Sequence, residues 1–485
     1  MTAASDTVTA ASLLDRFYIG GAWTKAASAE RFGVVDPSTE EVIAEVALGT
    51  VEDTDRAVAA AREAFAGWSA TPPEERARLI DRLRELVLQD TDRIARAISA
   101  EMGAAISWAL AAQVPLAAEH LRVAAEVARA YPFTTRRGTT AVLREPIGVC
   151  GLITPWNWPL YQITAKVGSA LAAGCTLVLK PSELSPLSAA LFAELVDRAG
   201  VPAGVFNMVH GTGPVVGARL ASHPEVDMVS ITGSTRAGVE VARAAAATVK
   251  RVAQELGGKS PNVILPDADL ARAVPPGVNA AMRNVGQSCS APTRMIVPRD
   301  RLEEVETLAR ATVEAMVVGD PSDPATTHGP SANRAQYERV QRMIQAGIDQ
   351  GARLIAGGTG RPAGLNRGFF SKPTVFSDVT ASMRIAREEI FGPVLAILPY
   401  DDVEEAVAIA NDSIYGLGAH VQGTDPIQLR KTAARIRAGQ VHLNYPAWDP
   451  HAPFGGYKQS GNGREYGREG LEEYLETKAI LGYFD

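Results

Sequence analysis

The sequence has few cysteines, no long apolar run and no block of charge of one sign, and each scarcity excludes a class of protein. Three cysteines in 485 residues, Cys150, Cys175 and Cys289, give no disulfide framework, which favours a reducing compartment and a cytoplasmic location. No apolar stretch approaches the ~18 residues of a membrane span, so no membrane partner is expected. The first dozen residues lack the basic and apolar regions of a signal peptide and are predicted to form a loose terminus.

Positive and negative charges are mixed along the chain. The 48 basic and 55 acidic residues give a net charge of −7, which argues against a nucleic-acid partner. The seven histidines are scattered singly, without the spacing of metal ligands, so we expect no catalytic metal. The length predicts two or three structural units.

Short apolar segments alternate with helical patterns in the middle of the chain. Strands are predicted over 148–153, 176–179, 205–209 and 228–231, with helices over 163–173, 186–199 and 214–222 between them. A second such stretch covers 257–442. This alternation predicts an α/β fold with parallel sheets, whose ligands bind at the carboxyl ends of the strands. Residues 132–146 break the pattern and predict a projecting hairpin, and the tail from 471 to 484 ends in a β-prone segment.

Cys289 lies among small and polar residues that leave its sulfur open to a ligand. Gly286 permits a backbone turn, and Ser288 and Ser290 add no bulk. A thiolate there could attack a carbonyl carbon. A small buried hydrophobic cysteine is the competing interpretation of this stretch taken alone.

Two further motifs carry groups that would assist such a nucleophile. Glu255 precedes two flexible glycines and could serve as a general base if burial raises its pKa. Asn157 lies between two tryptophans and two prolines, where a fixed amide N–H would suit an oxyanion hole. Taken alone, the first motif favours an ordinary helix-terminal glutamate, and a packed turn is the competing interpretation of the second.

Several motifs suit a dinucleotide. Lys180 and Glu183 follow a strand, and the carboxylate could accept hydrogen bonds from ribose hydroxyls while repelling a 2′-phosphate, which favours NAD over NADP. The glycine runs 211–217 and 233–238 each precede a helix, where backbone N–H groups favour phosphate, although neither run is a G-x-G-x-x-G fingerprint. A surface ion pair and ordinary helix-entry turns are the alternatives.

The order of seven motifs resembles that of the aldehyde dehydrogenase superfamily over residues 15–485. They are TPWNWP (154–159), KPSE (180–183), GST (233–235), ELGGKSP (255–261), GQSC (286–289), EEIFGPV (388–394) and PFGGYKQSG (453–461). The resemblance implies two Rossmann-like parallel-sheet domains, coenzyme-binding and catalytic, plus a small β oligomerisation arm. The implied bounds are 1–127 with 147–256, then 257–468, and 128–146 with 469–485 for the arm. A homodimer or homotetramer is implied as well.

The resemblance also implies roles for individual residues. Cys289 matches the nucleophile, Glu255 the general base and Asn157 the oxyanion-hole amide, while Lys166 and Glu465 match a lysine near the site and a second carboxylate of a proton relay. The implied coenzyme site for NAD comprises Ile153, Thr154, Pro155, Trp156, Lys180, Ser182, Glu183, Gly213, Gly217, Thr232, Gly233, Ser234, Leu256, Gly257, Glu389 and Phe391. Because Glu255 is present, water is expected as the acyl acceptor rather than coenzyme A.

The implied substrate tunnel departs from a site for small aliphatic aldehydes. Its mouth is expected to comprise Trp158, Gln162, Arg283, Tyr445, Trp448 and Phe454, and Ala165 is small where relatives are bulky. These residues suggest an aromatic or bulky apolar aldehyde. The alternatives are a semialdehyde whose carboxylate pairs with Arg283, or a non-catalytic binding relative. Pro275 and Pro276 fall where the family continues a helix, so that helix is expected to begin later or to be kinked.

Overall fold

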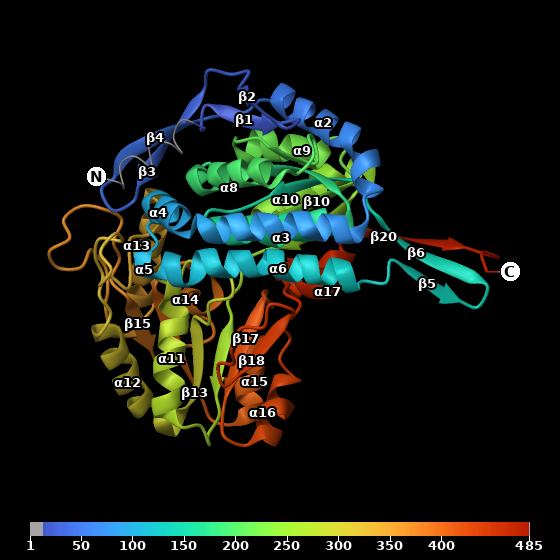
Figure 1. Cartoon of the computed structure of the whole chain (residues 1–485). Helices are drawn as coiled ribbons and strands as arrows, with labels where there is room; N and C mark the ends of the chain where they lie inside the picture. The colour runs from blue at the N-terminus through green and yellow to red at the C-terminus, as the bar shows by residue number, and fades with distance from the viewer. Residues whose placement is uncertain (1–12, 485) are drawn as a thin grey trace.

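The structure, a computed structural model, describes residues 13–484 as two largely parallel sheets flanked by helices, with a small antiparallel sheet projecting at one side (Figure 1). The predicted fold class is therefore confirmed. The first twelve residues, predicted to form a loose terminus, lie outside the described residues. No helix within 13–484 is long and apolar enough to cross a membrane. Over the same residues, no group of three His, Cys, Asp or Glu side chains could hold a metal ion.

The first sheet has helices packed on both faces. Alternate residues of its central strand β7 point to opposite sides, so Val149 and Ile153 join one apolar cluster while Cys150 and Leu152 join another. The helices α2, α9 and α10 supply the first cluster, and α3, α4, α6, α7 and α8 supply the second. The strand order is β19 (Gly461–Asn462), β11 (Arg251–Glu255), β10 (Met228–Thr232), β7 (Val149–Ile153), β8 (Thr176–Lys180), β9 (Phe206–Met208), β1 (Arg16–Ile19) and β2 (Ala22–Lys25).

The helices around the first sheet are those expected between its strands, plus a longer amino-terminal group. They are α2 (Val51–Ser69), α3 (Pro73–Gln89), α4 (Thr91–Met102), α5 (Ile106–Trp108), α6 (Val114–Ala130), α7 (Pro159–Ala173), α8 (Pro186–Ala199), α9 (Ala218–Ser222) and α10 (Thr235–Ala245).

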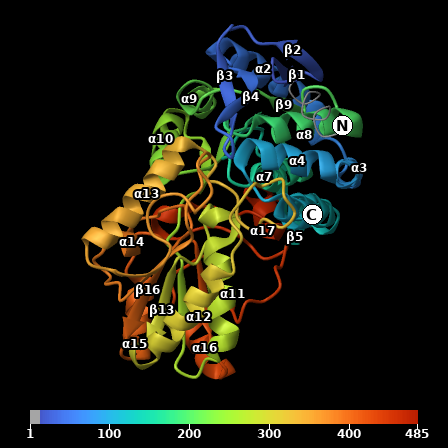
Figure 2. The same ribbon diagram turned by 90° about the vertical axis from the view of Figure 1, so that its left-hand side faces the viewer.

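The second sheet has seven strands, and alternate residues of its central strands also point into two different apolar clusters. Val263 and Ile296 face one apolar cluster, and Ile264 and Val297 face the other. The strand order is β14 (Arg353–Ala356), β15 (Thr374–Ser377), β16 (Val394–Tyr400), β13 (Arg294–Pro298), β12 (Pro261–Ile264), β17 (Gly418–Gln422) and β18 (Gln440–Leu443). Its helices are α11 (Leu270–Met282), α12 (Leu302–Glu314), α13 (Arg334–Asp349), α14 (Arg384–Arg387), α15 (Val403–Asn411) and α16 (Pro426–Ala433). Figure 2 shows this half of the molecule below the first.

The predicted hairpin and tail form one projecting sheet. The hairpin β5 (Thr134–Arg137) and β6 (Thr140–Pro146) pairs with β20 (Leu475–Ile480), which follows the short helix α17 (Gly467–Glu472). This three-stranded sheet extends away from the body on the right of Figure 1. A separate hairpin, β3 (Arg31–Asp36) and β4 (Glu41–Ala47), lies at the opposite end.

Three helix predictions need correction. α11 runs through both Pro275 and Pro276, so it does not begin after them; Asp269 caps its start by accepting hydrogen bonds from two backbone N–H groups. α7 begins at Pro159 rather than at 163, because proline is well accommodated in the first turn of a helix. The predicted helix over 214–222 is a π-helical turn, Gly213–Gly217, followed by α9.

Candidate functional site

A cleft of about 500 Å³ opens at the carboxyl ends of β7, β10 and β11. It is bounded on its other side by Cys289 and by the segment that follows α14. The predicted site residues that line it are Pro155, Trp156, Asn157, Thr232, Gly233, Ser234, Leu256, Gly257, Cys289, Glu389 and Phe391. The structure thus brings together residues of five of the motifs singled out in the sequence.

The loop that carries Cys289 has an unusual backbone. After α11, Asn284, Val285 and Gly286 all have positive φ, of 54°, 58° and 68°. Such conformations are costly for Val and Asn and persist only where surrounding contacts enforce them. Gly286 is required there, because a Cβ would lie 2.1 Å from the Gly392 carbonyl oxygen. The buried Gln113 supports the loop by donating to the Asn284 side chain at 3.2 Å.

Asn157 and Trp158 hold the same loop from the β7 side. The Asn157 amide donates to the Gln287 carbonyl at 2.9 Å, and the Asn284 amide donates to the Asn157 carbonyl at 2.8 Å. The Trp158 indole N–H donates to the Ser288 hydroxyl at 2.8 Å. The side chain of Asn157 is therefore fixed beside Cys289, with one of its two amide hydrogens still free of this bond.

Cys289 is the one partly exposed thiol of the three, since Cys150 and Cys175 are fully buried. Its enclosed position raises the pKa of the Cys289 thiol, and the nearby carboxylates Glu389 and Glu255 raise it further. The protonated thiol is therefore the resting form, and a base must remove its proton before it can act as a nucleophile.

Glu255 ends β11 and is 4% exposed, yet neither of its carboxylate oxygens has a hydrogen-bond partner among the described residues. Burial raises the pKa of Glu255 well above its usual value, and the neighbouring Glu465 adds to this, while Lys166 and Arg464 oppose it. A buried carboxyl group with free oxygens and a raised pKa is well suited to act as a general base.

Lys166 and Glu465 form a buried ion pair close to Glu255. The Lys166 ammonium, fully buried on α7, donates to Glu465 at 2.5 Å and to the Ser230 hydroxyl at 2.9 Å. The two residues predicted to assist catalysis therefore contact one another, although 299 residues separate them in sequence.

We expect Lys166→Met to destabilise the protein by about 3–5 kcal/mol, because it leaves the Glu465 charge buried without its partner. The free energy of unfolding in urea would measure this. The double variant Lys166→Met/Glu465→Gln should recover part of the loss. Equal stability of the single and double variants would contradict the expected coupling between these two charges.

The predicted ribose contacts lie at the same sheet edge, next to the cleft. Lys180 ends β8 and donates to Glu183 at 3.0 Å. The Thr154 backbone N–H donates to the Lys180 carbonyl at 3.1 Å. Gly217 lies beside Ile153, since a Cβ on Gly217 would be in ordinary contact with Ile153 Cδ1 at 3.7 Å. Ser182 caps its own turn by accepting from the Leu184 N–H, and Gly213 begins the π-helical turn after β9.

Aromatic rings form a continuous row from the Cys289 loop. Trp158 lies 6.0 Å from Trp108 and 5.5 Å from Tyr161, measured between ring centroids. Tyr161 continues to Trp448 at 6.4 Å and to Tyr466 at 6.0 Å, and Tyr466 stacks on Phe454 at 5.3 Å. Burial raises the pKa of Tyr161, and the nearby Cys289 contributes to the rise, so this row passes the nucleophile.

Arg283 lies at the Trp108 end of this row of aromatic rings. Its guanidinium lies 4.9 Å from the Trp108 ring centroid and is exposed. No carboxylate among residues 13–484 forms an ion pair with it. Burial of part of the side chain lowers the pKa of Arg283. An exposed guanidinium without a counter-charge could pair with an anionic group of a ligand.

Two predicted substrate residues, Tyr445 and Gln162, are not members of the aromatic row. The Tyr445 hydroxyl donates to the Ala273 carbonyl at 2.7 Å and accepts from the Asn262 amide at 2.9 Å, which ties it to α11 and β12. Gln162 is buried on the first turn of α7.

Some residues of the site were not predicted. Thr235 and Arg236 line the cleft and belong to the glycine run 233–238, so that motif could have indicated them. Gln336, Arg339 and Tyr415 line it from distant segments without a motif. In the aromatic row, Trp108, His120, Tyr161 and Tyr466 were missed; His120 lies 4.2 Å from Tyr161 and 4.4 Å from Tyr466, between ring centroids.

The cleft fits a dinucleotide. The first turn of α10, an 11-residue helix capped by Ser234, opens on it and offers backbone N–H groups to a pyrophosphate. The Trp156 and Phe391 rings meet edge to face at 5.5 Å within it. Gly257 leaves room for the Glu389 carboxylate, which a Cβ would meet at 2.3 Å.

Known proteins similar to this chain were found by sequence and by structure. A profile of the aldehyde dehydrogenase family matches residues 23–480. A 3-succinoylsemialdehyde-pyridine dehydrogenase from a Pseudomonas species is 56% identical over 468 residues, which cover 96% of this chain and 98% of the relative. A mutant aldehyde dehydrogenase from Pseudomonas syringae in complex with NAD⁺ and octanal superposes with a TM-score of 0.97, at 66% identity over 97% of both chains. For a Mycobacterium tuberculosis aldehyde dehydrogenase complexed with NAD⁺, the TM-score is 0.94 at 44% identity, over 96% of this chain and 98% of the other.

Proposed function

The chain belongs to the aldehyde dehydrogenase family, and we propose that it oxidises a bulky apolar aldehyde, aromatic or long-chain, to the carboxylic acid. It is an NAD-dependent enzyme, as its relatives are. The observation that carries the substrate class is the row of aromatic rings that runs past Cys289. One relative was crystallised with octanal, which has a long apolar chain, and another is named for an aldehyde that carries an aromatic pyridine ring.

In the proposed mechanism, the Cys289 thiol passes its proton to a water molecule in the cleft, and the thiolate sulfur attacks the aldehyde carbon. The oxyanion that forms accepts hydrogen bonds from the free amide hydrogen of Asn157 and from the Cys289 backbone N–H. Bound NAD⁺ supplies the hydride acceptor. The acyl group is left on Cys289 as a thioester.

Glu255 is proposed to act in the second half of the reaction. Its unpartnered oxygens can take a proton from water, which then attacks the thioester carbon and releases the acid and the thiol. Lys166 and Glu465 lie close enough to influence its charge and are proposed to pass the proton onward. A carboxylate in this position supports water, rather than coenzyme A, as the acyl acceptor.

The coenzyme contacts are proposed on the same geometric grounds. Glu183, beside Lys180, would accept from the adenosine ribose, and the α10 turn at Gly233 and Ser234 would hold the pyrophosphate. Glu389 would accept from the nicotinamide ribose, with Phe391 beside the ring. The remaining predicted coenzyme residues border this path at or after the carboxyl ends of β7, β8, β9, β10 and β11.

A semialdehyde that carries a carboxylate is the second candidate substrate. The exposed, unpaired guanidinium of Arg283 at the end of the aromatic row favours it. The stacking of Arg283 on Trp108 equally suits a wall for an apolar substrate.

The values of kcat/KM for a panel of aldehydes distinguish an apolar aldehyde from a carboxylate-bearing semialdehyde as the substrate. We expect kcat/KM for octanal and for an aromatic aldehyde to exceed that for acetaldehyde by at least about tenfold, because each added apolar group contributes about 1–3 kcal/mol in such a pocket. NADH absorbance measures the rates. A higher kcat/KM for succinic semialdehyde than for octanal, lost selectively in Arg283→Met, would overturn the apolar assignment. Comparable values for all chain lengths would also contradict it.

Assembly, domain bounds and location are proposed as well. In the sheet order β20-β6-β5 each outer strand has one edge that no strand of residues 13–484 pairs with, which supports pairing with a neighbour in a homodimer or homotetramer. The domain bounds are proposed as 1–127 with 147–256, 257–468, and 128–146 with 469–485. Three free thiols support a reducing, cytoplasmic setting.

A further inference from the structure

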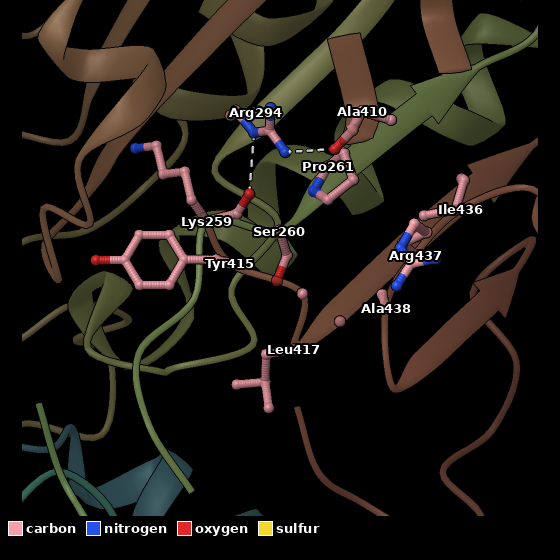
Figure 3. Close-up of a pocket in the computed structure, with 12 residues that line it drawn as sticks. Lys259, Ser260, Pro261, Arg294, Ala410, Tyr415, Leu417, Ile436, Arg437 and Ala438 are labelled. Carbon is pink, nitrogen blue, oxygen red and sulfur yellow. Dashed lines mark hydrogen bonds between the residues drawn. The ribbon is translucent and has the colours of Figure 1, made fainter. Parts of the chain in front are cut away.

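Lys259 is a buried lysine that the proposed mechanism does not use. Its side chain is 2% exposed, and its ammonium has no hydrogen-bond partner among the described residues. Lys259 and Tyr415 both line the small pocket drawn in Figure 3. Tyr415 also lines the coenzyme cleft, so the pocket of Lys259 and the cleft share this residue.

The surroundings of Lys259 contain both signs of charge. Burial lowers the pKa of Lys259 to about 7, and Arg294 lowers it further, while Glu389 is the carboxylate that opposes this most strongly. Arg339 and Glu388 act more weakly, in opposite directions. Arg294 itself is held by bonds to the carbonyls of Lys259 and Ala410 at 2.9 Å, as Figure 3 shows. The charge on Lys259 therefore has Glu389 as its main counter-charge.

Glu389 is held rigidly in the cleft wall. The Gly258 N–H donates to its Oε1 at 3.0 Å, Gly257 packs against the carboxylate, and the Arg339 guanidinium donates to its backbone carbonyl at 2.5 Å. Burial raises the pKa of Glu389 to about 7; the Gly258 N–H, then Lys259 and Arg339, restrain the rise. Near neutral pH the charge on Glu389 thus depends on its neighbours.

We propose that Lys259 is a positioning residue that acts through Glu389, keeping this carboxylate ionised so that it accepts hydrogen bonds from a ribose of the coenzyme. The effect is Coulombic and acts through space, since no hydrogen bond joins the two side chains. The inference rests on the proposed coenzyme role of Glu389.

The pH window follows from the directions of the two shifts. Lys259 is charged below about pH 7 and neutral above it. Glu389 needs help to remain ionised only at and below its own raised pKa. Both conditions hold together near and below neutral pH, so the contribution of Lys259 to NAD⁺ affinity is present there and vanishes at alkaline pH.

Lys259→Met removes the charge and keeps an unbranched, buried side chain. Titration of NAD⁺ by protein fluorescence should show the variant binding about tenfold more weakly than the wild type at about pH 6.5 and within twofold of it at about pH 9, since one pKa unit corresponds to a tenfold change. A loss of the same factor at every pH, or no loss at about pH 6.5, would overturn the proposal. If circular dichroism shows that Lys259→Met does not fold, Lys259→Gln takes its place.

Three companion variants make the result specific. Lys431→Met, an exposed lysine of α16, is the matched control and should leave the affinity unchanged at every pH. Glu389→Gln should weaken NAD⁺ binding, and Lys259→Met added to it should cause no further pH-dependent loss. Unchanged NAD⁺ binding in Glu389→Gln would overturn the coenzyme role of Glu389 and this inference with it. Weakened binding in Glu389→Gln, with a flat pH response in Lys259→Met, would overturn this inference alone.

Discussion

Replacement of Cys289 by alanine is expected to lower kcat for aldehyde oxidation by about 10⁴-fold or more, because covalent catalysis fails without its nucleophile. No second thiol lines the cleft within residues 13–484. NAD⁺ affinity should stay within about twofold of the wild type, since alanine removes only a sulfur and its proton from the wall of the coenzyme site. NADH absorbance and a fluorescence titration measure the two quantities.

Cys150→Ala is the matched control for this experiment. Cys150 is buried in β7 and contacts neither the cleft nor Cys289, so its removal should affect stability and spare kcat. Substantial activity in Cys289→Ala would exclude a covalent route and with it the proposed mechanism.

Glu255→Gln is expected to separate the two halves of the reaction. Glutamine has nearly the same shape but cannot take a proton from water, so the thioester should accumulate. Steady-state kcat should fall by about 10²–10⁴-fold. A rapid burst of about one NADH per active site should remain, because hydride transfer precedes the attack of water. Stopped-flow absorbance resolves the burst from the slow phase.

The pH dependence gives a second test of Glu255. A general base acts when ionised, and burial raises the pKa of Glu255, so wild-type kcat should increase as the pH rises through that value. Glu255→Gln should lose this limb of the profile, whereas Glu63→Gln, an exposed position on α2, should keep it. Loss of the burst in Glu255→Gln would show instead that Glu255 acts before hydride transfer.

The sequence was most informative where local pattern and burial agree. β7, β8 and β10 are apolar throughout because helices cover both faces of the sheet, so short apolar runs marked them closely. Motif residues such as Asn157 and Gly233 lie in the loops that follow these strands, and the rule that ligands bind at carboxyl ends placed them in one cleft.

The rest of the site depends on contacts that no local pattern records. The aromatic row joins Trp108 before α6, Tyr161 on α7 and Tyr466 near the carboxyl terminus, and only the packed fold makes them neighbours. Arg339 lies in a polar segment of α13, and its guanidinium donates a hydrogen bond to the backbone carbonyl of Glu389 in the cleft wall. Of the two expectations for Pro275 and Pro276, the later start of the helix was wrong, because a cap at Asp269 and tertiary packing outweigh the loss of two backbone donors.

The two-residue strand β19 has a consequence for any attempt to divide this enzyme into pieces. Gly461 pairs with Glu255 and Asn462 with Gln254, so a segment from near the carboxyl terminus completes the edge of the first sheet. A fragment that stops before residue 461 would leave backbone N–H and C=O groups of β11, the strand that ends in Glu255, without hydrogen-bond partners. Such an unpaired edge strand can pair with other chains and cause aggregation. The two halves are therefore not modules that can be expressed separately and recombined.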